Sequence, residues 1–277
     1  MKKEVNWDKI PLSHDALFGQ VMRDPTLCKT MLEKLLGFSI ESISYPETQK
    51  TFELSINAKG VRMDIFVQDG DGKKVYTVEM QTKNRGILGK RIRYYQGIAD
   101  MSLLQKGESY DDLPTHYVIF ICTFDPFGYG KYRYSFDSID EELGITLNDG
   151  THKLFFNTKG KLDDVPDDVK KFLRYLEGEL SDDPYVLQLE QKVQEIKNQE
   201  EWREYYMTFG QLLEEEYQYG LERGLERGLE RGLEQGKLES AKSLVLRGNT
   251  YEYVSEVLGI SIEKIKCYME HSIEITI

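Results

Sequence analysis

The stretch VRMDIFVQDGDGKKVYTVEMQ, residues 61–81, decides the fold of this chain. Its middle, residues 69–72, reads Asp-Gly-Asp-Gly, and apolar residues alternate with polar ones on both sides. Glycine adopts positive φ without steric cost and aspartate tolerates it, so this tetrapeptide favours a tight turn. The sequence therefore predicts a β-hairpin of two adjacent antiparallel strands.

Side chains of a strand alternate between its two faces, and this assigns the polar residues of the hairpin. In the first strand, one face is aliphatic and consists of Val61, Met63, Ile65 and Val67. Asp64 lies on the opposite face, together with Arg62 and Phe66. Glu79 and Gln81 lie side by side in the second strand, on the face opposite Tyr76, Val78 and Met80. Asp64, Glu79 and Gln81 are therefore candidate catalytic residues.

Carboxylates from adjacent strands can hold a hard divalent cation such as Mg²⁺, which takes few protein oxygens and keeps several waters. Such a metal polarises a phosphodiester and generates the attacking hydroxide, and Gln81 can orient the water or a phosphate oxygen. The alternative is that Asp64 and Glu79 are ordinary polar residues on a solvated sheet face. Their spacing alone does not separate the two readings.

The pattern of Asp64, a hairpin, Glu79 and Gln81 resembles the PD-(D/E)XK nuclease superfamily, in its Rpn branch of recombination-promoting nucleases or transposases. The resemblance extends over residues 8–160 and includes the motif SHDALF at residues 13–18, the run at residues 90–95 and the segment at residues 105–122. Met63 stands where the superfamily name has proline, and Gln81 stands where it has lysine. The glutamine is similar to what this branch carries in general.

The resemblance implies an α/β fold with a PD-(D/E)XK nuclease-like core, a mixed central sheet flanked by helices, and a long C-terminal helical extension. It also implies a Mg²⁺-dependent DNA endonuclease, with Mn²⁺ or Ca²⁺ as other candidate ions and RNA as the alternative polymer. Asp64 and Glu79 would be the metal ligands and Asp15 an auxiliary acid from the first helix. His14 would contact phosphate or cap that helix, and we favour the cap. The rival hypothesis is a catalytically inactive interaction protein that acts through its helical tail.

The charge distribution bears on a nucleic-acid partner. The chain has a net charge of -12, which opposes phosphate binding, but residues 82–107 carry six basic residues against one acid and net +5. The candidate DNA-binding residues are Lys83, Arg85, Lys90, Arg91 and Arg93. Residues 86–105 predict a helix whose buried positions are Ile87, Ile92, Tyr95, Ile98, Leu103 and Leu104. A basic helix beside the carboxylates could guide the DNA backbone, or it could simply be a solvated face.

The remaining core elements complete a first domain at residues 1–162. A helix is expected over residues 15–36, bent near Pro25 and closed by Gly37, and a strand over residues 50–57. Residues 115–123 are nearly all β-branched or apolar and predict a central buried strand. Further strands are expected at residues 132–136 and 153–157, on either side of an acidic loop at residues 137–150.

Residues 163–248 read as a helical extension. Pro166 and Pro184 each begin a helix, and the second is expected to run to about Arg247. Its apolar stripe, which can pack on the first domain or on a second subunit, consists of Val186, Leu189, Val193, Ile196, Trp202, Phe209 and Leu213. Residues 249–277 predict a small cap of two short helices around Gly259, which resembles a helix-turn-helix fragment but has few basic residues on its second helix.

A tandem repeat covers residues 220–236, with Gly-Leu-Glu-Arg three times, then Gly-Leu-Glu-Gln and a final Gly236. Each interior glycine disfavours a helix by about 0.5–1 kcal/mol relative to alanine, so either close helix contact offsets this cost or the region is loose. We expect homo-oligomerisation through Leu221, Leu225, Leu229 and Leu233, with a flexible helical spacer as the alternative.

The sequence predicts neither a membrane-spanning segment nor a signal peptide, and this bears on the cellular location. No apolar run approaches the ~20 residues that span a bilayer, and acids follow the N-terminal lysines where a signal peptide needs an apolar core. Cys28, Cys122 and Cys267 are odd in number and far apart, which indicates reduced thiols. We expect a cytoplasmic protein with no membrane partner.

Overall fold

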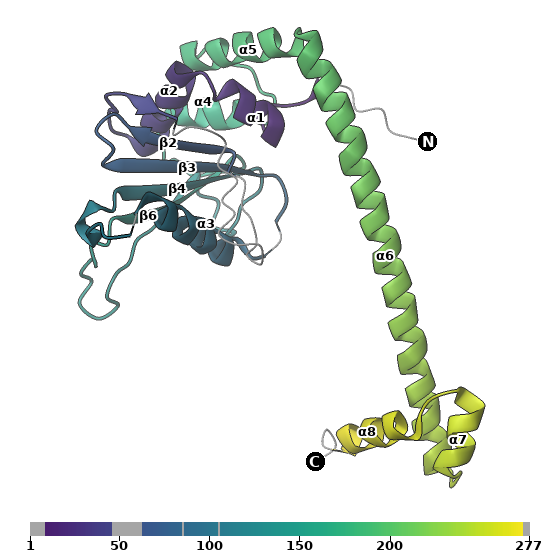
Figure 1. The fold of residues 1–277 in the computed structure, drawn as a ribbon. Coiled ribbons are helices and arrows are strands. Elements are labelled where there is room, and N and C mark those ends of the chain that lie inside the picture. The colour runs from purple at the N-terminus through teal and green to yellow at the C-terminus, as the bar shows by residue number, and fades with distance from the viewer. Residues whose placement is uncertain (1–8, 46–62, 85, 105, 274–277) are drawn as a thin grey trace. The chain divides into compact units, whose positions relative to one another are not determined.

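The computed structural model describes residues 9–45, 63–84, 86–104 and 106–273, except for the side chains of residues 205–219 and 271–273. The chain divides into two compact units, Met1–Arg203 and Glu204–Ile277 (Figure 1). The strand expected at residues 50–57 lies outside the described ranges. Among the helices within those ranges, none is both long and apolar enough to cross a membrane.

The helix expected over residues 15–36 is divided at Pro25, as predicted. It forms α1, Asp15–Val21, and α2, Pro25–Leu36. Proline suits the first position of α2 because no N–H is needed there, and the Asp24 carboxylate accepts hydrogen bonds from the backbone N–H groups of Thr26 and Leu27. Gly37 ends α2 with φ of 79°, a left-handed conformation that glycine adopts readily.

A mixed sheet forms the centre of the first unit, and its described strands lie in the order β1-β2-β3-β4-β6-β5. The strands are β1, Ile43–Ser44; β2, Ile65–Asp69; β3, Lys74–Gln81; β4, Thr115–Cys122; β5, Arg133–Phe136; and β6, Thr151–Asn157. β4 pairs in parallel with β3 and β6, and the other neighbours are antiparallel. The predicted hairpin and the central buried strand are both confirmed, and β6 begins two residues earlier than expected.

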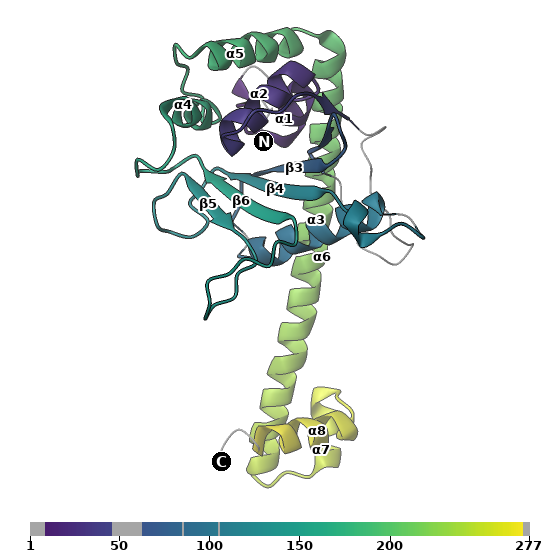
Figure 2. The same ribbon diagram turned by 90° about the vertical axis from the view of Figure 1, so that its left-hand side faces the viewer.

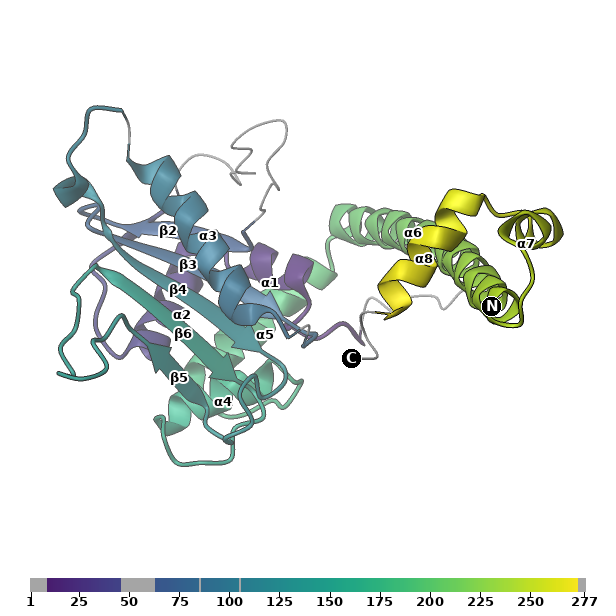
Figure 3. The ribbon, with the colours of Figure 1, turned by 90° about the horizontal axis from the view of Figure 1, so that it is seen from below.

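Helices cover both faces of this sheet. The helix α3, Leu88–Leu103, lies on one face, while α1 and α2 lie on the other together with α4, Asp167–Tyr175, and α5, Pro184–Lys197 (Figure 2). In Figure 3, α3 lies in front of the strands, and α2 and α4 lie behind them. Parallel strands need a crossover connection, and α3 provides it between β3 and β4, followed by the short 3-10 helix Tyr110–Asp112. Residues 82–87 connect Gln81, at the end of β3, to the first turn of α3.

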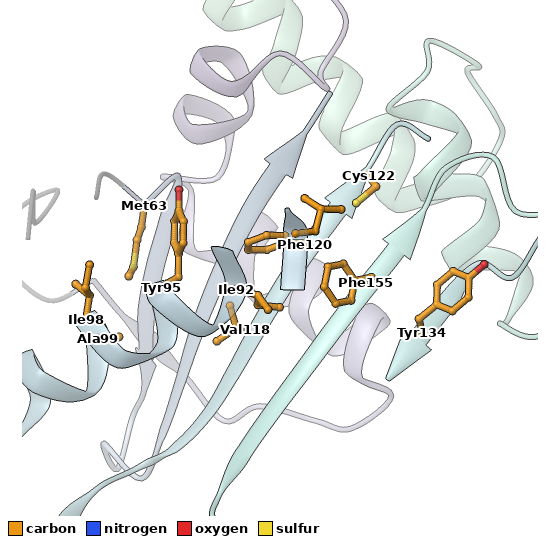
Figure 4. Packing of buried hydrophobic residues seen from close by; sticks show 11 residues of the cluster. Met63, Ile92, Tyr95, Ile98, Ala99, Val118, Phe120, Cys122, Tyr134 and Phe155 are labelled. Atoms are coloured by element: carbon orange, nitrogen blue, oxygen red, sulfur yellow. The ribbon is translucent and has the colours of Figure 1, made fainter. Parts of the chain in front are cut away.

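The core under α3 is built from the helix and from β4, β5 and β6 (Figure 4). The expected positions Ile92, Tyr95 and Ile98 are buried. Leu88 and Ala99, which we did not predict as buried positions, are buried as well. Ile87 was predicted wrongly, because it is the residue before the helix and is 53% exposed. Leu103 and Leu104, at the end of the helix, are only half-buried for the same reason.

Met63 does not share a face with Ile65, contrary to the strict alternation we expected. The chain bends at Asp64, just before β2 begins, so Met63 packs in the cluster under α3 beside the partly buried Phe66. The Thr77 hydroxyl lies 3.8 Å from the Met63 sulfur. A bend of this kind shifts the alternation of side chains between the two sheet faces by one residue. The carboxylate of Asp64 stays near the end of β3.

Pro166 and Pro184 mark the starts of α4 and α5, as predicted. α5 contacts α1, α2 and α4, so residues 163–203, which we expected in a separate extension, belong to the unit that holds the sheet. The Tyr185 hydroxyl donates a hydrogen bond of 2.8 Å to the Leu27 carbonyl in α2. The buried apolar stripe of α5 consists of Val186, Leu189, Val193 and Ile196.

The prediction of one helix from Pro184 to about Arg247 was wrong. α5 ends at Lys197 with Asn198 as its C-cap, and α6, Glu200–Leu246, begins after Gln199. Asparagine competes with helical hydrogen bonding through its own amide and favours helix ends, which accounts for the break. The Gly-Leu-Glu-Arg repeat lies within α6.

Two further helices complete the second unit. α7, Tyr251–Leu258, ends at Gly259 with φ of 63°, and α8, Ile262–Ile273, follows (Figure 1). Val254 and Ile265 are buried against Ala241 of α6. The expected pair of short helices around Gly259 is therefore present, and its apolar face packs on the end of α6.

Candidate active site

Asp64 and Glu79 lie opposite one another at the ends of β2 and β3. The antiparallel register pairs Ile65 with Val78, and its continuation by one residue brings Asp64 beside Glu79. Glu79 and Gln81 occupy the carboxyl end of β3, where the parallel neighbour β4 carries Phe120 and Cys122 at the same level. The hairpin predicted from the turn sequence thus brings these three polar side chains to one end of the sheet.

Backbone hydrogen bonds orient both carboxylates. The backbone N–H of Asp64 donates to Oε1 of Glu79 at 2.9 Å, and the backbone N–H of Met80 donates to Oδ2 of Asp64 at 2.9 Å. Each carboxylate therefore accepts an amide of the opposite strand. These bonds fix the two side chains before any ligand binds, as a preorganised site requires.

Glu79 is buried, with only 2% of its surface exposed, and its pKa is raised well above its ordinary value of 4.5. Burial is the main cause, because removal from water disfavours the charged form, and the negative charge of Asp64 adds to it. The Asp64 amide, the Arg91 guanidinium and the Tyr95 hydroxyl act in the opposite direction. Two neighbouring acids that resist ionising together are a common feature of functional sites.

Gln81 is 4% exposed and joins the same group through Arg91. Nη1 of Arg91 donates a hydrogen bond of 2.6 Å to Oε1 of Gln81, and Nη2 lies 3.7 Å from Oε2 of Glu79. The side-chain nitrogen of Gln81 is buried and has no hydrogen-bond partner among the described residues. The amide thus presents two donors with no acceptor from the described part of the chain.

Tyr95 holds Arg91 in this position, one helical turn further along α3. The guanidinium donates to the Tyr95 hydroxyl from Nε at 3.2 Å and from Nη2 at 2.7 Å, and it lies 5.2 Å from the centre of the ring. Burial and the negative charge of Glu79 raise the pKa of Tyr95 to about 12. Tyr95 is buried, as we expected for a core position. Its spacing of four residues from Arg91 places both side chains on one helix face, so it also accepts these hydrogen bonds.

The structure does not bring Asp15 into the carboxylate pair. It is the first residue of α1, where its carboxylate accepts the Ala16 amide at 2.8 Å and lies 3.1 Å from the His14 ring. Within the described ranges, Asp15 does not join Asp64 and Glu79 in a group of three acids that could hold a metal ion. α1 does approach the site, because a Cβ added to Gly19, one turn from Asp15, would lie 3.6 Å from the Asp64 carbonyl.

His14 occupies the N-cap position of α1, as we favoured, but its side chain makes no capping hydrogen bond. Only its carbonyl takes part in the helix, as the acceptor of the Phe18 amide. The capping role predicted for the His14 side chain is therefore wrong, because an imidazole places its nitrogen further from the first turn than the short oxygen side chains that favour this position.

The predicted basic residues separate into two groups. Lys83, Lys90 and Arg93 are exposed near the start of α3, whereas Arg91 turns inward to Gln81 and Tyr95. Arg85 lies outside the described residues. Among the basic residues that the structure describes, the exposed Lys83, Lys90 and Arg93 have the position that contact with a polymer backbone requires.

The residues present fit a divalent cation that keeps most of its own water. In the described ranges, no group of three or more histidine, cysteine, aspartate or glutamate residues has the arrangement of a protein-only metal site. Asp64 and Glu79 nevertheless supply two carboxylates from adjacent strands, and Mg²⁺ is commonly bound by one or two carboxylates plus water and phosphate.

A mixed sheet whose hairpin carries an acid on each strand, followed by a crossover helix at the same end, defines a nuclease-like α/β protein of the PD-(D/E)XK type. Residues 14–208 match the sequence model of the PD-(D/E)XK nuclease family transposase, and the chain belongs to this family. The match confirms the resemblance to the Rpn branch. Neither a curated protein nor a solved structure matches the chain.

Family membership supports a nuclease-like role with DNA as the implied substrate. PD-(D/E)XK nucleases generally use divalent metal ions. The match ends at residue 208, so it includes α4, α5 and the start of α6 in addition to the sheet.

Proposed function

We propose that this protein is a metal-dependent DNA endonuclease that hydrolyses phosphodiester bonds, with a role in recombination or transposition. The observation that supports it most is the pair Asp64 and Glu79, each held by an amide of the opposite strand at 2.9 Å. A solvated sheet face, the alternative reading, would not bury Glu79 or raise its pKa.

The proposed roles follow from position. Asp64 and Glu79 hold the metal, which is Mg²⁺ in this proposal with Mn²⁺ or Ca²⁺ as other candidates. When bound, such an ion polarises the phosphate and lowers the pKa of a water molecule. Gln81 presents its NH₂ group to that water or to a phosphate oxygen. Asp15 remains a proposed auxiliary acid, because α1 approaches Asp64 at Gly19.

Lys83, Lys90 and Arg93 are proposed to guide the DNA backbone, together with Arg85. The three described side chains are exposed and precede or begin α3, which starts beside the end of β3. A local basic surface can attract phosphate even when the whole chain has a net charge of -12. Contacts of this kind position DNA but read no sequence.

The test is cleavage of supercoiled plasmid by the full chain with Mg²⁺, Mn²⁺, Ca²⁺ or EDTA. Glu79→Gln keeps the size of the side chain and removes its charge, and Glu142→Gln is the matched control at an exposed acid of the 137–150 loop. We expect nicking that needs a metal, is lost in Glu79→Gln and persists in Glu142→Gln. A single-stranded RNA substrate in parallel distinguishes DNA from RNA cleavage, and strand transfer would appear as joined products.

A second candidate function is that of a catalytically inactive, nuclease-like interaction protein. The observation that favours it is the exposure of the repeat leucines on α6, at 50% for Leu221, 67% for Leu225, 74% for Leu229 and 64% for Leu233. A series of exposed leucines is typical of a surface that binds another helix. Metal-independent association of a protein that cleaves nothing would favour this candidate.

We propose that the same leucines form homo-oligomers whichever function holds. The described residues leave open space beside Gly224 and Gly228, where an added Cβ would meet no atom within 4 Å. A second α6 could approach closely at these glycines and offset their cost to the helix. We also propose the cytoplasm as the location, since the three cysteines, all within the described residues, form no disulfide there and two of them are buried.

A further inference from the structure

The amide of Gln81 is oriented by chemistry as well as by packing. A guanidinium has only donors, so the atom of Gln81 that faces Arg91 at 2.6 Å must be the oxygen. The NH₂ group then points away from Arg91. It is buried and makes no hydrogen bond with any residue that the structure describes. Buried donors are rarely left without an acceptor, which marks this group as one that awaits a ligand.

Arg91 is itself held firmly enough to impose this orientation. Two of its nitrogens donate to the Tyr95 hydroxyl, and Tyr95 packs edge-on against Phe120 in the core at a centroid distance of 5.8 Å. Arg91 and Tyr95 lie four residues apart on α3, so a single helix face positions both. The order of contacts runs from the core through Tyr95 and Arg91 to Gln81.

We infer that Arg91 is a positioning residue, which fixes the Gln81 amide so that its NH₂ group donates to the attacking water or to an oxygen of the scissile phosphate. Gln81 stands where the superfamily pattern has lysine, and an amide brings donors but no charge. In this inference Arg91 supplies the positive charge, with its Nη2 3.7 Å from Oε2 of Glu79, and the Gln81 amide supplies the hydrogen-bond donor. This inference rests on the proposed nuclease function.

The experiment compares Arg91→Met, Gln81→Lys and the double variant in the full chain, with Arg174→Met as the control at an exposed arginine of α4. The quantity measured is the single-turnover rate of plasmid cleavage at saturating enzyme with Mg²⁺. Arg91→Met should lower this rate about 10- to 100-fold, the usual effect of losing a group that orients a catalytic one. Arg91→Lys, which keeps a donor for the Gln81 oxygen, should recover most of it.

The double variant gives the decisive result. A lysine at position 81 carries its own charge and has no amide to orient, so Arg91→Met should cause no loss in that background. Removing Arg91 should even speed cleavage there, because the two cations repel. An equal loss in both backgrounds would overturn the inference, since Arg91 would then act by itself, for example on phosphate.

Thermal unfolding of the same metal-free proteins supplies a readout that does not depend on activity. Gln81→Lys should lower Tm more when Arg91 is present than in the Arg91→Met background, because only the former has like charges in contact. Equal Tm shifts in the two backgrounds would contradict the contact between Arg91 and the side chain at position 81. If the unaltered protein cleaves no plasmid, the proposed function fails and this inference fails with it. If the protein cleaves plasmid but the effects of Arg91→Met and Gln81→Lys on the cleavage rate are additive, only the inference is overturned.

Discussion

Asp64 and Glu79 each accept a backbone amide of the strand that carries the other, at 2.9 Å in both directions. These hydrogen bonds connect the chemistry of the site to the register of the hairpin, because a slip of one residue would separate the two acids and turn one to the opposite face. They also mean that each carboxylate has a structural role as well as a proposed catalytic one.

Asp64→Asn should abolish cleavage and keep the fold, since the amide oxygen can still accept the Met80 N–H while the charge for the metal is lost. Asp64→Ala should also lower the free energy of unfolding by about 1–3 kcal/mol, because it leaves that N–H without its acceptor. Plasmid cleavage and urea unfolding measure the two effects. Cleavage by folded Asp64→Asn at the unaltered rate would place the site elsewhere.

Metal affinity should rise with pH, because Glu79 must lose its proton to bind a cation. The pKa of Glu79 is higher in the folded protein than in the unfolded chain. Without metal, ionised Glu79 therefore lowers the free energy of unfolding at pH values above its folded pKa. This destabilisation is lost as the pH falls through the folded pKa and Glu79 takes up a proton. Below the folded pKa, each pH unit should cost about tenfold in affinity for Mn²⁺. Calorimetry in two buffers should detect the released proton, and a flat pH profile would contradict the assignment.

Lys90→Gln combined with Arg93→Gln should weaken DNA binding and reduce its dependence on salt. Each lost phosphate contact lowers the slope of log affinity against log salt by about 0.9. Fluorescence anisotropy over a series of salt concentrations measures this slope, with Arg174→Gln as the control. If the slope of the double variant equals that of the control, the basic residues of α3 do not contact the backbone.

Leu225→Gln combined with Leu229→Gln should reduce the mass seen by light scattering without loss of secondary structure. Both side chains are exposed within the single chain, so their replacement removes no core packing. Leu143→Gln, at an exposed leucine of the 137–150 loop, is the matched control. An unchanged mass would favour the reading of the repeat as a helical spacer.

The hairpin was predictable because local chemistry determines it. The Asp-Gly-Asp-Gly turn and the alternation around it produced the correct pairing, and the proline and glycine signals marked the ends of α2 and the starts of α4 and α5. The family match shows that the resemblance carried by Asp64, Glu79 and the adjacent motifs was real.

Features that depend on contacts distant in sequence were not predictable in the same way. The bend at Asp64 changes the face of Met63, and nothing in local alternation marks it. Arg91 and Arg93 have the same charge and neighbouring positions on one helix, yet only Arg91 meets the end of β3. Which of two similar side chains turns inward depends on where the helix lies over the sheet, and that is decided by the core under α3.

Anomalous diffraction from crystals of the full chain soaked in Mn²⁺ would show directly whether Asp64 and Glu79 bind a metal ion. We expect a manganese peak within coordination distance of carboxylate oxygens of both Asp64 and Glu79, and no such peak in crystals of Glu79→Gln. Manganese bound elsewhere on the chain, with none at this pair, would contradict the proposal that these two acids form the metal site of the nuclease.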